Sequence, residues 1–217
     1  MLAFFLALAL DGAAVAAPPA ATYRYDAAID RKPVGGSTLT LTTTPQGLKL
    51  AESSISHLPT GDTRTQAMML LDASLVPTSY TSSYKVQDDT MKATVVFDAR
   101  TAVVTAGGDP RTFQLGGSSK HFVVLDIATA SGFLMLPSQM HAWRDADTTA
   151  LVPALGSVLF LSILHDVQSQ RPAGVPPADV SISFAGEAPF VEWYDPATLV
   201  VDEIDVPGQK LQIVRRR

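Results

Sequence analysis

The 217-residue sequence contains no cysteine. That absence excludes disulfide bonds, thiolate nucleophiles, zinc ribbons and iron–sulfur clusters together. Charge is also scarce, since only 17% of the residues are Asp, Glu, Lys or Arg, against about 25% in an average soluble domain. The net charge of −5 and the pI near 5.2 argue against a nucleic-acid-binding surface. With 47% hydrophobic residues, the chain is too apolar to be disordered and long enough to bury a proper core.

Long hydrophobic runs are lacking too, apart from an apolar stretch over residues 1–10. Such a stretch rises only about 15 Å as a helix, half the hydrocarbon core of a bilayer, so we expect no transmembrane span. The tripeptide Ala-Val-Ala at 14–16 fits the small-residue rule for signal-peptide cleavage. The sequence therefore predicts a signal peptide over residues 1–16, a single domain over 17–217, and a periplasmic or secreted location. The alternative is that the apolar stretch forms a buried N-terminal strand or helix.

From residue 23 onward, the sequence has the period-two alternation of half-buried strands. In the first such segment, Tyr23 and Tyr25 share one face, while Arg24 and Asp26 take the other. Turns rich in Pro, Gly and Asp separate about a dozen segments of this kind, a pattern typical of an antiparallel sheet and not of βαβ units. The last four segments are expected at 180–184, 190–194, 199–206 and 210–214.

One segment departs from this alternation. Apolar residues at helical spacing between positions 127 and 134 predict a short helix over 126–136, ended by Pro137. A sheet of about a dozen strands must curl, close or split. The predicted fold is therefore all-β with minor α, a single curved antiparallel sheet that forms a half-barrel packed around one or two short helices.

The polar residues supply no catalytic set. The Gly-x-Ser-x-Gly motif that exposes a serine nucleophile is absent. The histidines lack the i, i+2 or i, i+4 spacing that directs two imidazoles to one metal ion; they are His57, His121, His141 and His165. We therefore expect no catalytic residue, no metal and no cofactor, which makes an enzyme the less favoured class.

The notable side chains are aromatic, although aromatic residues make up only 7% of the chain. A curved sheet has a concave side, which a single short helix does not have to fill. The residues expected to bind a hydrophobic ligand there are Tyr80, Tyr84, Phe97, Phe113 and Phe160. Ordinary core packing is the alternative for each of them, and Tyr25 is assigned to the structural core.

Two segments carry a resemblance to a known family. The stretch 191–195 (VEWYD), with Leu199 and 205–208 (DVPG) after it, resembles the closing hairpins of an exported bacterial family of unknown function. The stretch 71–80 (LDASLVPTSY) resembles the segment that joins two long strands in that family. The resemblance implies a half-barrel of the lipoprotein-carrier (Lol) type, an envelope location, and Trp193 in the structural core. It carries over no catalytic residue, and fold alone is weak evidence of function.

Three functions remain open at this point. The first is a non-catalytic bacterial envelope protein that holds a lipid or acyl chain in the concavity of the half-barrel. The second is an envelope scaffold that binds a protein partner through the edge of its sheet. The third is a hydrolase with a dispersed Ser/His/Asp set. The expected partners are thus a hydrophobic small molecule or an envelope protein, and not nucleic acid.

Overall fold

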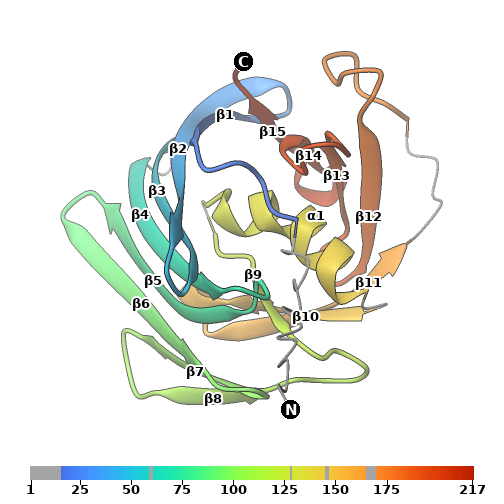
Figure 1. Cartoon of the computed structure of the whole chain (residues 1–217). Helices are drawn as coiled ribbons and strands as arrows, with labels where there is room; N and C mark the ends of the chain where they lie inside the picture. The colour runs from blue at the N-terminus through green and yellow to red at the C-terminus, as the bar shows by residue number, and fades with distance from the viewer. Residues whose placement is uncertain (1–15, 59–60, 128, 145–146, 165–169) are drawn as a thin grey trace, which may run out of the picture.

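Fifteen strands form one curved sheet in the computed structural model (Figure 1), which describes residues 16–58, 61–127, 129–144, 147–164 and 170–217. The predicted signal peptide lies outside the described residues except for its last position. The strands are β1 (Thr22–Ile29), β2 (Lys32–Thr44), β3 (Gly47–Leu58), β4 (Gly61–Asp72), β5 (Pro77–Val86), β6 (Asp89–Phe97), β7 (Thr101–Ala106), β8 (Arg111–Gln114), β9 (Phe122–Val124), β10 (Asp147–Val152), β11 (Ser157–Leu164), β12 (Val180–Gly186), β13 (Phe190–Tyr194), β14 (Val201–Val206) and β15 (Leu211–Arg215). The helices are α1 (Ser131–Trp143) and two 3-10 turns, η1 (Pro153–Leu155) and η2 (Pro207–Gln209).

The sheet is built mainly from hairpins between successive strands. Its order is β8-β7-β6-β5-β4-β3-β2-β1-β15-β14-β13-β12-β11-β10-β9, so the first and last strands of the chain pair in its interior. Neighbouring strands are antiparallel except β9 and β10, which are parallel. The predicted single curved sheet is confirmed, with the correction that it is mixed at this one pair. The sheet stays open and does not close into a barrel.

Alternation along the strands decides which side chains enter the core. On β4, Ala67, Met69 and Leu71 are buried, whereas Met68 between them is exposed. Strand geometry places i and i+2 on one face, so this pattern buries every second residue against the concave side. The three apolar residues face α1, which lies inside the curve of the sheet (Figure 1).

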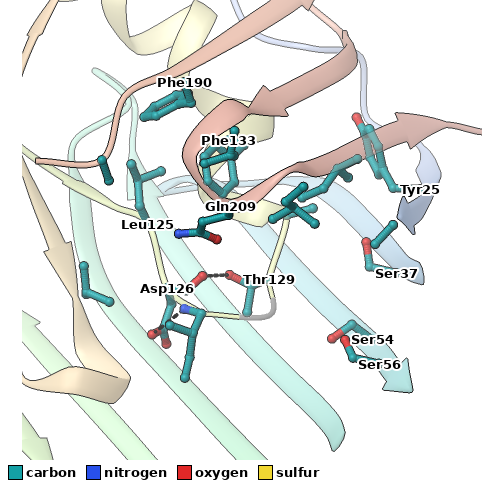
Figure 2. Close-up of a pocket in the computed structure, with 18 of the residues that line it drawn as sticks. Tyr25, Ser37, Ser54, Ser56, Leu125, Asp126, Thr129, Phe133, Phe190 and Gln209 are labelled. Carbon is teal, nitrogen blue, oxygen red and sulfur yellow. Dashed lines mark hydrogen bonds between the residues drawn. The ribbon is translucent and has the colours of Figure 1, made fainter. Parts of the chain in front are cut away.

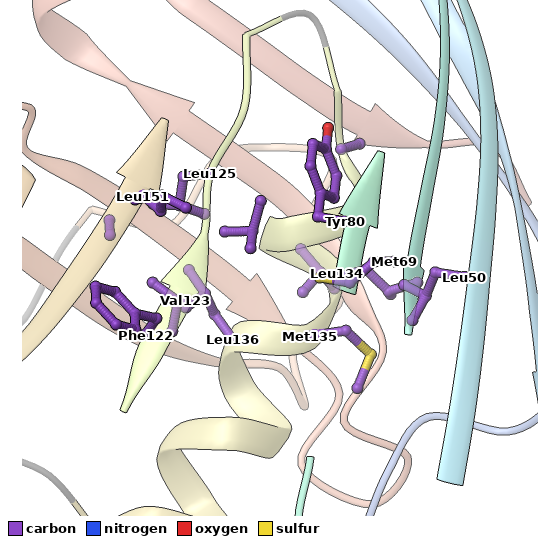
Figure 3. Close-up of a cluster of buried hydrophobic side chains, with 14 of the residues drawn as sticks. Leu50, Met69, Tyr80, Phe122, Val123, Leu125, Leu134, Met135, Leu136 and Leu151 are labelled. Carbon is purple, nitrogen blue, oxygen red and sulfur yellow. The ribbon is translucent and has the colours of Figure 1, made fainter. Parts of the chain in front are cut away.

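Helix α1 supplies the apolar filling of the half-barrel. Leu134, Met135 and Leu136 are fully buried in the core cluster of Figure 3. Its first turn lies so close to β9 that a Cβ on Gly132 would be 1.7 Å from the carbonyl oxygen of Val124. Only glycine allows this approach, which fixes the depth of the helix in the concavity.

The predicted boundaries of this helix were wrong. The helix begins at Ser131 and runs through Pro137 to Trp143, instead of covering 126–136. Proline removes one hydrogen bond from a helix interior and is normally unfavourable there. Because almost every residue around Pro137 is buried against the sheet, tertiary packing outweighs this local cost.

The two ends of the sheet approach each other on the concave side. Phe97 at the end of β6 packs on Phe122 of β9, with ring centroids 5.9 Å apart. The η1 turn contacts β6 and β7 as well. The ends are therefore joined by side chains and turns and not by pairing of the strands.

Candidate ligand-binding cavity

A cavity of about 490 Å³ lies between the concave face and the N-terminal part of α1 (Figure 2). Strands β1, β2 and β3 form one wall, and the segment before α1, the η1 turn, β13 and β15 form the others. Ligand-binding pockets commonly measure about 300 to 1,000 Å³. The volume is thus of the size that holds one small molecule.

One side of this cavity is apolar. Phe133 of α1 and Phe190 of β13 meet edge to face, with centroids 5.3 Å apart, and both line the space. The other large apolar lining side chains are Ile29, Val34, Leu125, Ile127, Val152, Leu155, Leu159, Val206, Leu211 and Ile213. A surface of this kind favours the hydrocarbon part of a ligand.

Glu52 of β3 lines the cavity and caps α1 from a distant part of the chain. Its two carboxyl oxygens accept hydrogen bonds from the backbone N–H of Ala130 at 2.8 Å and of Ser131 at 2.9 Å. The helix has no cap from its own neighbouring side chains. Burial raises the pKa of Glu52 to about 7, while these backbone hydrogen bonds oppose the rise. The role of this residue is to orient the helix start.

Asp126, which also lines the cavity, is the centre of a buried hydrogen-bond cluster, here called the Asp126 cluster. It accepts bonds from the hydroxyls of Tyr80 (2.9 Å), Ser82 (3.0 Å) and Tyr84. Its other oxygen accepts the N–H of Ile127 at 3.0 Å and of Ala154 at 2.9 Å. A carboxylate offers about four lone-pair sites, so five donors leave it no capacity to act as a general base.

The aromatic residues predicted to bind ligand lie elsewhere. Tyr80 and Tyr84 are buried with their hydroxyls on Asp126, and burial, followed by the charge of Asp126, raises the pKa of both. Phe97 and Phe113 pack against the core, and Phe160 is 50% exposed on the other face of β11. None of these five residues is among those that line the cavity. Their ligand-binding role remains a prediction.

The two residues assigned to the core are both buried. Tyr25 is 2% exposed, lines the cavity, and donates its hydroxyl to the carbonyl oxygen of Val201 at 2.9 Å. Trp193 is 5% exposed, but it lies on the face of β13 opposite Phe190, and the guanidinium of Arg171 stacks 4.8 Å from its ring centroid. Trp193 is thus buried on the face of β13 away from Phe190, with Arg171 packed on its ring.

Sequence reasoning missed the polar residues of the cavity. Alternation places Glu52 on the same face of β3 as the buried Leu50, but a charged side chain in a strand is normally expected to face solvent. Asp126 follows the apolar run 122–125, which is a usable signal of a carboxylate at the end of a buried strand. Ser37 and Ser54 gave no signal, because isolated serines in strands are common.

Other kinds of site find no support in the described residues. No group of three or more His, Asp or Glu side chains within them is arranged to hold a metal ion. No helix in that part of the chain is long and apolar enough to cross a membrane. The lining contains serines but no histidine among the residues that the structure describes, so it offers no Ser–His pair.

Comparison with known proteins yields one fold likeness. No family model matches the sequence, and no curated protein matches it. The crystal structure of a DUF1089 family protein from Pseudomonas aeruginosa is similar, with a TM-score of 0.52 and 10% identity over 96% of this chain and 97% of that chain. This neighbour supports the expected likeness to a family of unknown function. The expected half-barrel of the lipoprotein-carrier type stays a prediction. At this identity, the comparison establishes that the chain shares its fold with a DUF1089 family protein, over nearly its whole length.

Proposed function

We propose that this protein holds one small, largely hydrophobic molecule, such as a lipid or acyl chain, in the cavity between β1–β3 and α1. The observation that carries the proposal is a cavity of about 490 Å³ with an apolar wall built from four separate parts of the chain. The cavity opens to solvent, so its apolar lining is exposed to water unless a hydrophobic molecule covers it. Burying hydrocarbon there is favourable by about 25 cal/mol per Å² of apolar surface.

The other two functions draw less support. The edge strands are β8, with four residues, and β9, with three buried residues. Short or covered edges are those that natural sheets use to prevent strand addition. Neither carboxyl group in the described lining is free for acid–base work, because Asp126 accepts five hydrogen bonds and both oxygens of Glu52 accept backbone N–H groups at the start of α1.

An envelope location is part of the same proposal. The apolar stretch 1–10 and the Ala-Val-Ala site at 14–16 support export with removal of residues 1–16. Expression of the full chain in a bacterium, followed by fractionation and intact mass measurement, tests it. We expect a periplasmic product shortened by the leader, and a full-length cytoplasmic product would contradict export.

The ligand is tested on protein purified from its own host, by native mass spectrometry and by organic extraction of bound lipid. Two variants of the same strand provide the comparison. Ser56→Phe places an aromatic ring in the cavity that Ser56 lines. Ser53→Phe makes the same change on the exposed face of β3.

We expect wild-type protein and Ser53→Phe to carry a bound small molecule, and Ser56→Phe to lose it. A ligand-free mass for the wild type, with no lipid recovered by extraction, would count against the proposal. Equal occupancy of Ser56→Phe and Ser53→Phe would place the ligand somewhere other than this cavity.

A further inference from the structure

The wall of the cavity opposite the phenylalanines carries a row of hydroxyl groups. Cross-strand pairing places Tyr25 of β1 beside Ser37 of β2, Ser37 beside Ser54 of β3, and Ser54 beside Thr65 of β4. Directly paired residues in a sheet point to the same face. The four side chains, here called the hydroxyl row, thus run across the strands on the concave side, and the first three of them line the cavity. Figure 2 shows Ser37 and Ser54 on the side of the pocket away from Phe133 and Phe190.

The hydroxyl row contains unmet hydrogen-bonding capacity. The oxygens of Ser37 and Thr65 are both buried and have no hydrogen-bond partner in the described structure. Thr65 is only 1% exposed, and Ser37 is itself a lining residue of the cavity. Buried hydroxyls are almost always paired with protein, water or ligand. A ligand atom next to Ser37 would supply the missing partner.

The charges around the cavity restrict what that atom belongs to. The lining contains no Lys, Arg or His among the described residues, and its only ionisable acids are Glu52 and Asp126. Asp126 has its five donors, and the oxygens of Glu52 face the first amides of α1. An ionised carboxylate or phosphate on the ligand would be buried without a cation and close to these acids, which is strongly unfavourable.

We infer that the ligand is an amphiphile with an uncharged hydrogen-bonding head, such as an alcohol or an ester, which contacts Ser37 while its hydrocarbon chain lies against Phe133 and Phe190. This inference rests on the proposed function and names the chemical class of its ligand. The polar wall selects the head, because it offers hydroxyl groups and no positive charge. The apolar wall holds the chain without selecting its chemistry.

The probes are dodecane, dodecan-1-ol and dodecanoate, which share one hydrocarbon chain and differ only in the head. They separate recognition of the head by the polar wall from binding of the chain by the apolar wall. Each is measured by displacement of a fluorescent probe from delipidated protein, at a pH where dodecanoate is ionised. We expect dodecan-1-ol to bind roughly tenfold more tightly than dodecanoate. Equal or tighter binding of dodecanoate would overturn the inference and leave the proposed function standing. If none of the three binds, the proposed function itself fails.

A pair of neighbouring variants tests the place of the head. Ser37→Ala removes a buried hydroxyl that has no partner at hydrogen-bonding distance but lies near enough to Glu52 to lower the pKa of that carboxyl, so a thermal melt of the variant accompanies the binding measurement. Thr38→Ala is the matched control, because Thr38 is the next residue of β2 and is exposed. We expect Ser37→Ala to lower the affinity for dodecan-1-ol several-fold with no change for dodecane, and Thr38→Ala to alter neither. An unchanged alcohol affinity in Ser37→Ala would mean that only water occupies this position, and would overturn the inference.

Discussion

Two buried carboxyl groups of this protein stand in opposite situations. Asp126 accepts five hydrogen bonds and joins β5, the segment after β9 and the η1 turn. Glu192 on β13 is fully buried, and neither of its oxygens has a hydrogen-bond partner in the described structure. Its cross-strand neighbours are Ile182 of β12 and Ile204 of β14. Burial therefore raises the pKa of Glu192 well above its usual value.

The difference shows what holds each part of the sheet. Near Asp126, where the ends of the sheet approach without strand pairing, converging donors fix the geometry. Around Glu192, regular pairing of β12, β13 and β14 already fixes the backbone, so apolar packing holds the region despite an unpaired acid. A buried carboxyl thus stabilises the fold only where donors meet it.

The largest effect is expected from removal of the Asp126 carboxylate. Asp126→Ala leaves the hydroxyls of two tyrosines and of Ser82, together with two backbone amides, without their acceptor, and should reduce the free energy of unfolding by about 4 kcal/mol. Urea denaturation of the variant and the wild type measures this loss in the free energy of unfolding. Asp147→Ala is the control, since the Asp147 carboxylate also accepts two serine hydroxyls but lies at the surface. Similar losses for the two variants would show that convergence of donors on Asp126 carries no special weight.

The second effect concerns apolar packing on the other face of β13. Trp193→Ala should cost about 3 to 5 kcal/mol, as large truncations of buried residues do. Arg171→Ala removes the exposed cation–π contact and two hydrogen bonds to the carbonyl oxygens of Pro176 and Asp179, and should cost about 1 to 2 kcal/mol, less than the loss of the indole. Thermal melts of both variants measure these losses. An unchanged melting temperature for Trp193→Ala would show that apolar packing does not hold β13.

Much of the sheet was predictable, because period two is a local signal. Strand β13 matches its predicted range 190–194, and β12 begins at Val180 as expected. The predicted helix ended too early because the rule that proline ends a helix considers only the local sequence. In the structure Pro137 lies inside the helix, where its burial depends on the whole sheet.

The cavity was not predictable from the same signals. Alternation states which residues share a face, but not which distant segment covers them. Glu52 meets α1 across 78 residues of sequence, and Tyr80 meets Asp126 across 46. Alternation along β5 places Tyr80 and Tyr84 on one face, but the partner of their hydroxyls, Asp126, depends on long-range folding.

The third effect is a loss of stability with rising pH. Burial raises the pKa of Glu52 to about 7 and of Glu203 and Asp179 to about 6, with the charges of Asp205 and Asp202 contributing to the latter two. Since the folded state keeps these protons while the unfolded chain releases them near pH 4 to 5, stability falls from about pH 5 until the folded pKa values are passed. For Glu52 alone the loss is about 2 to 3 kcal/mol.

Thermal melts at about pH 5 and pH 8 test this expectation. The loss from Glu52 alone should lower the melting temperature by roughly 5 to 10 °C over that interval. Glu203 and Asp179 add to this fall, and Glu52→Gln should show a smaller fall because it has no proton to release. The carboxyls of Asp147 and Asp195, whose pKa values are lowered by hydrogen bonds, contribute only at more acidic pH. A melting temperature that rises between pH 5 and pH 8 would contradict burial as the dominant cause.

The smallest effect sharpens the contrast between the two carboxyls. Glu192→Leu replaces an unpaired acid by a hydrocarbon between Ile182 and Ile204, and should raise the free energy of unfolding by about 1 to 2 kcal/mol. Glu192→Gln keeps an unpaired polar group but cannot ionise, so it should gain stability only at high pH. Urea denaturation at about pH 5 and pH 8 distinguishes the two contributions. If Glu192→Leu destabilises the protein as strongly as Asp126→Ala does, Glu192 has a partner in solution, and the two carboxyls are alike after all.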